Sequence, residues 1–172
     1  MIAIDATCPL VTKVHIEANK HVRQGRHIFL IGHAGHPEVI GTMGQVEANE
    51  ITLIETVEDA FAVQPPEDCD LAFATQTTLS ADETAEIITV LQHRFPEIRG
   101  PKGEDICYAT TNRQNAVKAM AKDVDLCLVI GAQNSSNSKR LVETALNAGI
   151  AKAELIADSS MLPYELIDDA AV

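Results

Sequence analysis

Residues 4–10 of the chain read IDATCPL and residues 105–111 read DICYATT, so a Cys followed four positions later by a Thr occurs twice. The two cysteines, Cys8 and Cys107, are 99 residues apart. Each begins the same order of features, namely an amphipathic segment, an apolar run, and a Gly 24 residues after the Cys. The chain therefore contains a repeated unit, and we expect its two cysteines to meet at one site on a pseudo-symmetry axis.

Short apolar runs alternate with amphipathic helical patterns along the whole chain, with polar turns between them. An uninterrupted apolar run is typical of a strand buried on both faces of a parallel sheet. The sequence therefore predicts an α/β fold built from repeated three-layer αβα units with small, mostly parallel sheets. The predicted strands are 1–4, 28–31, 51–54, 71–74, 126–130 and 154–156.

Helix signals fill the intervals between these strands. Predicted helices start at Pro9, follow the loop 32–38, run from Ser80 toward Pro96, start at a cap formed by residues 111–114, and span 136–148. We expect the helix after residue 111 to bury Val117, Met120, Ala121 and Val124. The Gly- and Pro-containing stretch 99–103 predicts a linker between a unit at 1–103 and a second, C-terminally incomplete unit at 104–172.

Charge and composition exclude several classes of function. The net charge is −12, with 13 Lys+Arg against 25 Asp+Glu, so no basic surface is expected for nucleic acid or an anionic membrane. No apolar run approaches the ~20 residues of a membrane span. Four cysteines without a CxxC pair favour metal or catalytic roles in a reducing compartment. We therefore expect a cytoplasmic protein without nucleic-acid or membrane partners.

Cys8 and Cys107 each lie just before a predicted helix. The free N–H groups and dipole of a helix N-terminus stabilise a thiolate, the form that binds iron or zinc or attacks carbon. Two thiolates are too few for a closed iron–sulfur or zinc site, so a further ligand must come from elsewhere or the metal must keep an open position. Cys69 and Cys127 lack such a position, and we interpret them as structural.

Two polar clusters follow predicted strands. In the first, His36 next to a helix start can hold an anionic group, while Glu38 can pass protons. The competing interpretation makes His36 an N-cap and Glu38 a first-turn carboxylate. His33 is expected to be structural. Of Thr77 and Thr78, at the end of another strand, one is expected to cap the chain and the other to face the site.

The second cluster, residues 135–138, reads SSNS and opens a helix. Its hydroxyls, amide and free N–H groups form a phosphate cradle that needs no net positive charge. Simple N-capping is the alternative, but capping needs only one of the four residues.

Five motifs together resemble those of the 4-hydroxy-3-methylbut-2-enyl diphosphate reductases, the terminal enzymes of the non-mevalonate isoprenoid pathway. They are DATCP (5–9), GHAGHPE (32–38), TQTTLS (75–80), ICYATTNRQ (106–114) and NSSNS (134–138). They occur in the family's order and cover nearly the whole chain. The family builds three similar α/β units around a central 4Fe-4S cluster, with one Cys from each unit.

The resemblance implies a role for each motif. Cys8 and Cys107 would be two of the three cluster ligands, the third being absent from this chain. The substrate diphosphate would be bound by His36, Ser135, Ser136 and Asn137. Thr77 would contact the substrate near its hydroxyl and Glu38 would deliver a proton. Two electrons from ferredoxin or flavodoxin would release water and yield isopentenyl or dimethylallyl diphosphate.

The family's first unit, with its GFCAGV motif, and its final AGAS motif have no counterpart here. We therefore expect a fragment that holds no stable cluster and has little activity by itself. One alternative is a non-enzymatic module that binds a phosphorylated ligand and has inert cysteines. Another is a zinc hydrolase in which Cys8, Cys107 and His36 bind the metal and Glu38 acts as base.

Overall fold

The computed structural model describes residues 4–5, 7–103, 105–168 and 170. The chain forms two compact units: a first unit of residues 1–77 and 81–107, and a second unit of residues 78–80 and 108–172. The predicted family boundary at residue 103 stays a prediction, whereas the compact units divide after Cys107. Of the strand predicted at 1–4, residues 1–3 lie outside the described residues, and Ile4 is exposed and not in a strand.

A three-stranded parallel sheet forms the centre of the first unit. Its strands are β1 (Arg26–Ile31), β2 (Ile51–Ile54) and β3 (Asp70–Thr75), in the order β2-β1-β3. In this register Ile28 pairs with Ile51 on one side and with Ala72 on the other. The three apolar runs are thus confirmed as strands, and the parallel pairing brings their carboxyl ends to one edge of the sheet.

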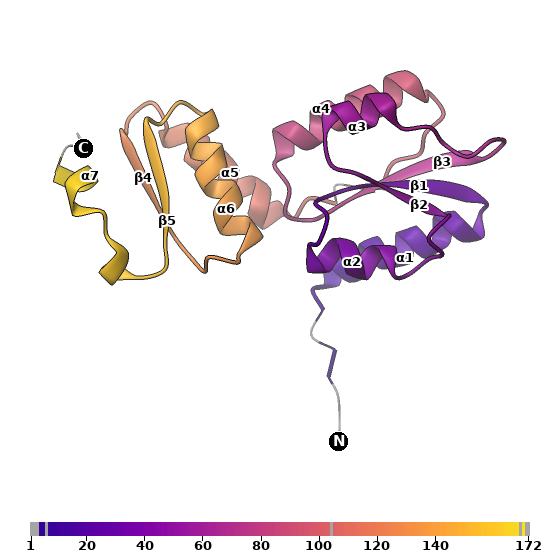
Figure 1. The fold of residues 1–172 in the computed structure, drawn as a ribbon, viewed down its shortest axis with the longest axis horizontal. Coiled ribbons are helices and arrows are strands. Elements are labelled where there is room, and N and C mark those ends of the chain that lie inside the picture. The colour runs from indigo at the N-terminus through magenta and orange to yellow at the C-terminus, as the bar shows by residue number, and fades with distance from the viewer. Residues whose placement is uncertain (1–3, 6, 104, 169, 171–172) are drawn as a thin grey trace. The chain divides into compact units, whose positions relative to one another are not determined.

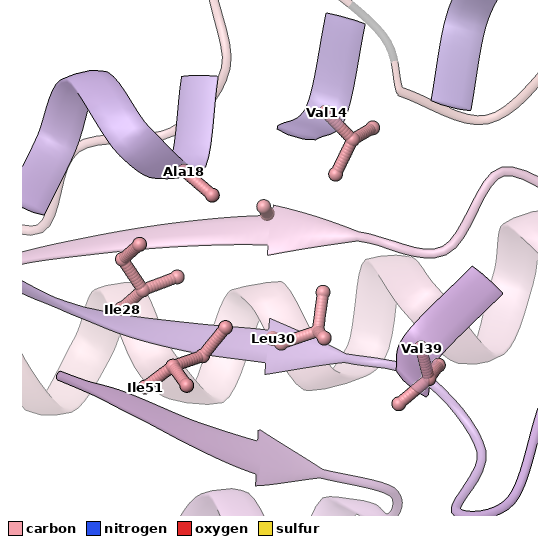
Figure 2. Packing of buried hydrophobic residues seen from close by; sticks show 7 residues of the cluster. Val14, Ala18, Ile28, Leu30, Val39 and Ile51 are labelled. Carbon is pink, nitrogen blue, oxygen red and sulfur yellow. The ribbon is translucent and has the colours of Figure 1, made fainter. Parts of the chain in front are cut away.

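Helices cover both faces of this sheet (Figure 1). They are α1 (Pro9–Arg23) and α2 (Pro37–Met43) on one face, and α3 (Val57–Ala62) and α4 (Ala81–Arg94) on the other. Figure 2 shows the packing on the first face, where the buried residues are Val14, Ala18, Ile28, Leu30, Val39, Ile51 and Ala74. Phe29 alternates with Ile28 and Leu30 along β1 and so lies on the other face of the sheet. It packs against Phe95, with ring centroids 5.6 Å apart. The three-layer prediction is confirmed for this unit.

Local signals account for the ends of these helices. Pro9 occupies the first turn of α1, where its missing N–H is not needed, and Gly25 ends the helix segment with φ +76°. Helix α3 was absent from the sequence prediction although its signal is present. Thr56 and Asp59 form a complete capping box, each side chain accepting a backbone N–H of the other residue.

The second unit contains a two-stranded parallel sheet of β4 (Leu126–Ile130) and β5 (Lys152–Ile156). Helices α5 (Tyr108–Met120) and α6 (Ser136–Asn147) pack on it, and a 3-10 turn (Ser159–Met161) and α7 (Tyr164–Asp168) follow. The buried core consists of Val117, Ala121, Cys127, Val129, Ala145 and Ile150. Both predicted strands are confirmed here as well.

The structure corrects two predictions about α5. This helix begins at Tyr108, so residues 111–114 lie inside it and do not form its cap. Gln114 is buried there and donates its side-chain amide to the Leu79 carbonyl at 2.9 Å. Met120, predicted to be in the core, is 43% exposed because it is the last residue of the helix, while Ala121 packs inward.

The predicted linker at 99–103 begins as part of the first unit. The Phe73 N–H donates to the Arg99 carbonyl at 2.9 Å, and the Arg99 N–H donates to the Leu71 carbonyl at 3.0 Å. A Cβ on Gly100 would lie 2.6 Å from the Phe73 ring. Only a glycine lets the chain pass so close to β3, so this stretch is held against the sheet.

Candidate functional site

Both repeated cysteines directly precede a helix, as their sequence positions predict. Cys8 is the N-cap of α1, and its carbonyl accepts the Thr12 N–H at 3.0 Å and the Thr12 hydroxyl at 3.4 Å. Cys107 immediately precedes α5. Both thiols are free; Cys8 is exposed and Cys107 is half-buried. The sequence repeat is therefore a structural repeat of Cys, helix, strand and helix.

A buried ion pair joins the two cysteine-bearing segments within the first unit. Lys13, in the second turn of α1, contacts Asp105 at 3.1 Å, and the Asp105 side chain is fully buried. The second oxygen of Asp105 accepts the Thr75 N–H at 3.2 Å, and the Cys107 N–H donates to the Thr77 carbonyl at 2.9 Å. These contacts hold the Cys107 segment against α1 and the carboxyl end of β3.

The Glu38 carboxylate is held by two groups of one residue. The Thr77 N–H donates to Glu38 Oε1 at 2.7 Å, and the Thr77 hydroxyl donates to Oε2 at 3.1 Å. Thr77 is 5% exposed, and Glu38 lies in the first turn of α2. Strand β3 and helix α2 thus place these two residues together, 39 positions apart in the sequence.

Burial raises the pKa of Glu38. The two hydrogen bonds from Thr77 favour the charged carboxylate and lower the pKa, while the nearby Asp105 charge raises it. Burial is the largest effect, so the carboxyl keeps its proton to higher pH than an exposed Glu does. A carboxyl of this kind is suited to donate a proton.

His36 is the N-cap of α2, as one of the two interpretations of the sequence stated. Its Nδ1 accepts the Glu38 N–H at 3.2 Å, so in the neutral ring the proton is on Nε2. Burial, followed by the neighbouring His33, lowers the pKa of His36. Capping and anion binding are compatible here, because the cap uses Nδ1 and leaves Nε2–H as a donor.

The loop that carries His36 is held by a hydrogen bond to the buried Gln76 side chain. This side chain is 1% exposed, and its oxygen accepts the His33 N–H at 3.1 Å. A Cβ on Gly32 would lie 2.6 Å from Val39 and 3.2 Å from the Gln76 oxygen. Gly32 is therefore needed at the end of β1 for the loop to pass this close to Gln76.

The N-terminus of α6 forms a second polar group, within the second unit. Ser135 is the N-cap, with its hydroxyl accepting the Ser138 N–H at 3.3 Å. The Thr78 hydroxyl donates to Ser136 Oγ at 3.1 Å, and the Thr110 hydroxyl donates to Asn137 Oδ1 at 2.9 Å. Asn137 Oδ1 already accepts the Thr110 hydroxyl, so the side-chain amide N–H groups of Asn137 are the ones that can donate to a ligand. The cap uses an acceptor lone pair of Ser135 and leaves its hydroxyl proton, so Ser135, Ser136 and Asn137 all stay candidate ligand groups.

Each group of predicted site residues lies within its own unit. Cys8, His36, Glu38, Thr77 and Cys107 belong to the first unit, and Ser135, Ser136 and Asn137 belong to the second. Sequence reasoning missed Thr110 and Asp105, and for Thr78 it left open which of two roles applied. Thr110 lies in the motif 106–114, and Asp105 lies two residues before Cys107. Their partners, Asn137 and Lys13, are evident only in the folded chain.

The described residues include no group of three or more His, Cys, Asp or Glu side chains placed to hold a metal ion. The zinc set of Cys8, Cys107 and His36 is therefore not assembled within that part of the chain. Cys127 is buried in β4, and burial raises the pKa of its thiol. Cys69 donates its thiol to the Pro66 carbonyl at 3.3 Å. The burial of Cys127 and the hydrogen bond of Cys69 agree with structural roles for these two cysteines.

The profile of the family described as "LytB protein" matches residues 1–172. The chain belongs to the LytB protein family. It is 64% identical to the 4-hydroxy-3-methylbut-2-enyl diphosphate reductase of Hyphomonas neptunium, over 95% of this chain and 52% of that protein. It is 60% identical to the reductase of the same name from Chelativorans sp., over 98% of this chain and 51% of that protein.

A solved LytB-type structure has the same fold. The E-1-hydroxy-2-methyl-but-2-enyl-4-diphosphate reductase from Plasmodium falciparum matches with a TM-score of 0.92 and 37% identity, over 97% of this chain and 52% of that one. The chain thus spans about half the length of the curated relatives it matches. Among its described residues, no helix is both long and apolar enough to cross a bilayer.

Proposed function

We propose that this chain forms part of an iron–sulfur reductase that removes the hydroxyl group of 4-hydroxy-3-methylbut-2-enyl diphosphate. Family membership and the names of the relatives support the reaction class. The observation that carries the proposal is the Glu38 carboxyl, which has a raised pKa and is bonded through both oxygens to Thr77. A reductive dehydroxylation needs such a proton donor, because hydroxide is a poor leaving group.

The reaction breaks the allylic C–O bond and uses two electrons and two protons. One proton leaves with the hydroxyl group as water, and the other adds to carbon to give isopentenyl or dimethylallyl diphosphate. The Thr77 N–H can only donate, so a proton on Glu38 would be on Oε2, next to the Thr77 hydroxyl. That hydroxyl can accept this proton and donate its own. In the proposed route it passes the proton from Glu38 to the substrate oxygen.

None of the proposed diphosphate ligands of this chain is a lysine or an arginine. His36 offers Nε2–H, Asn137 offers its amide N–H groups, and Ser136 offers its hydroxyl. The first N–H groups of α6 have no partner inside the helix and favour negative charge. We propose that each group of residues, His36 in the first unit and the start of α6 in the second, is a diphosphate-binding group.

The chemistry of the cysteines fits two ligands of an iron–sulfur cluster. Cys8 and Cys107 are free thiols at helix starts, and the ion pair of Lys13 with Asp105 joins their segments. A bound 4Fe-4S cluster would transfer electrons singly from a ferredoxin or flavodoxin. The family resemblance implies one Cys from each of three units, so these two thiols would be two of the three protein ligands. We expect the chain alone to hold no stable cluster and to turn over little substrate.

A chimera tests the proposal. In it, this chain replaces the matching stretch of the Hyphomonas neptunium reductase, which supplies the remaining half of the length. We expect the purified chimera, reconstituted without oxygen, to be brown and to reduce the substrate with a chemical electron donor. The isolated chain treated in the same way is expected to remain colourless.

Cysteine variants of the chimera separate this function from a ligand-binding module. Cys8→Ser and Cys107→Ser should each lose the iron absorbance and the activity, whereas the matched control Cys69→Ser should keep both. A colourless chimera that still binds the diphosphate substrate, with unchanged affinity in the cysteine variants, would favour the non-enzymatic module. Zinc without sulfide in the chimera would contradict the reductase.

A further inference from the structure

The first unit has a cavity of about 420 Å³ beside the C-terminal half of α1, whereas Cys8 is the N-cap of that helix. It lies between the last turns of α1, the beginning of β1, and the segment that follows α4. Its lining residues are Glu17, Lys20, His21, Gln24, Arg26, Arg99, Gly100 and Lys102. None of them belongs to the candidate site described above.

Positive charge is concentrated in this cavity. Four of the chain's 13 Lys and Arg residues line it, against one of its 25 Asp and Glu residues. A surface with a net charge of −12 would not place four cations together by composition alone. Lys20 lies in the last turn of α1, where a positive charge interacts favourably with the helix dipole. Arg26, Arg99 and Lys102 come from other parts of the chain, so the dipole does not account for them.

The cations in the cavity are incompletely paired. The Arg26 side chain is only 11% exposed, its nearest carboxylate oxygen is 3.9 Å away on Asp70, and its Nε has no hydrogen-bond partner. Its other contacts are Gln24 and the His21 ring. Among the described residues, Lys20, Arg99 and Lys102 form no ion pair within 4.0 Å.

The segment carrying Arg99 is held in place before any ligand arrives. Backbone bonds to Leu71 and Phe73 extend the sheet at Arg99, and Gly100 packs on the Phe73 ring. The wall of the cavity is therefore preorganised, and only the ends of the long side chains must order on binding.

We propose that this cavity is a binding site for a small phosphorylated anion that carries at least two negative charges. Its volume is within the range of small-ligand sites. Arginine guanidinium groups match phosphate oxygens with two parallel N–H donors, and lysines add point charges. The site is separate from the proposed substrate site, so it does not depend on the proposed function.

His21 reports binding directly. Burial lowers the pKa of His21, and the charges of Arg26, Lys20 and Arg99 lower it further, while Asp105 raises it. An anion that neutralises those cations must therefore raise the pKa of His21. Titration of the ¹³C-labelled chain with inorganic diphosphate, followed by histidine NMR, should show a saturable shift of the His21 ring signal and a higher pKa.

Charge variants with opposite expected effects test the assignment. Arg99→Gln and Lys20→Gln should each weaken the diphosphate affinity about tenfold, the low end of the range for a hydrogen bond to a charged group. Glu17→Gln removes the one carboxylate of the cavity and should strengthen the binding. The matched control Arg23→Gln, an exposed residue in the same turn of α1 but outside the cavity, should change little.

Several outcomes would overturn the proposal. They are a His21 signal that does not respond to millimolar diphosphate, an equal loss in Arg23→Gln, and binding of citrate or an acidic peptide more tightly than diphosphate at the same residues. Ser136→Ala tests the proposed substrate site separately and should leave the His21 response unchanged. Substrate binding that is unchanged in Ser136→Ala, with an intact His21 response, would thus count against the proposed function alone.

Discussion

The Thr77 backbone N–H and the Thr77 hydroxyl bind the two different oxygens of Glu38, at 2.7 and 3.1 Å. Thr77 follows strand β3, and Glu38, in α2, follows strand β1. The carboxyl ends of parallel strands share one edge, so polar residues that follow those strands can meet there. The contact joins a buried acid to a hydroxyl that can pass its proton on.

Thr77→Val should raise the pKa of Glu38 further. The hydroxyl bond favours the charged carboxylate, so its loss favours the protonated form, while the backbone N–H bond is retained. Carboxyl ¹³C NMR of the chain as a function of pH measures this shift. Thr78→Val, which changes the neighbouring hydroxyl that donates to Ser136, is the control. A Glu38 pKa that stays the same or falls in Thr77→Val contradicts the assigned contact.

Glu38→Gln should lower the turnover number of the chimera by about 10²- to 10⁴-fold, the usual contribution of a general acid. The amide oxygen can still accept the Thr77 N–H, so KM should change little. The wild-type rate should fall as the pH rises through the raised pKa of Glu38, because the protonated donor is lost, and this part of the profile should flatten in Glu38→Gln. Glu58→Gln, in the first turn of α3, is the control. Equal pH profiles for wild type and Glu38→Gln would exclude Glu38 as the donor.

Lys13→Met should destabilise the first unit by about 1–3 kcal/mol, because it leaves the buried Asp105 carboxylate without its cation. Lys13 is 34% exposed, which keeps the value below that of a fully buried pair. Hydrogen exchange of the β1 and β3 amides measures the change. Adding Asp105→Asn should restore part of the loss, since no charge then remains buried. If the double variant loses stability additively, the two residues are not coupled.

Gly131→Ala should destabilise the second unit by about 1–3 kcal/mol. The added Cβ would lie 2.2 Å from Ser138 Oγ and 2.9 Å from Ser138 Cβ, which pushes the start of α6 away from β4. Urea unfolding followed by the β4 amides measures the effect. Gly103→Ala, where a Cβ meets nothing within 4 Å, should change stability by less than about 0.5 kcal/mol. Similar effects of both substitutions would contradict the close packing at Gly131.

Local patterns in the sequence determined most of the elements. The apolar run at 28–31 became a strand buried on both faces, because such a strand must be apolar on both, whereas the run at 126–130 became a parallel strand that buries Cys127 and Val129 and leaves Ile130 exposed. Pro9 marked the start of α1 because a proline suits the first turn of a helix. The two cysteines were correctly placed before helices. Each of these features depends on neighbours a few residues away.

Only the tertiary structure decided which side chains meet. Helix α5 starts at Tyr108, three residues before the predicted cap. The sequence gives no capping signal at Tyr108. Cys107, just before it, donates its N–H to the Thr77 carbonyl, a contact that only the folded chain makes. The partners of Glu38 and Lys13 lie 39 and 92 residues away. Periodicity specifies the face of a strand or helix, whereas such contacts depend on how strands are ordered in the sheet. The sequence alone therefore determined the elements and the kinds of polar groups at their ends, and the fold decided the pairs.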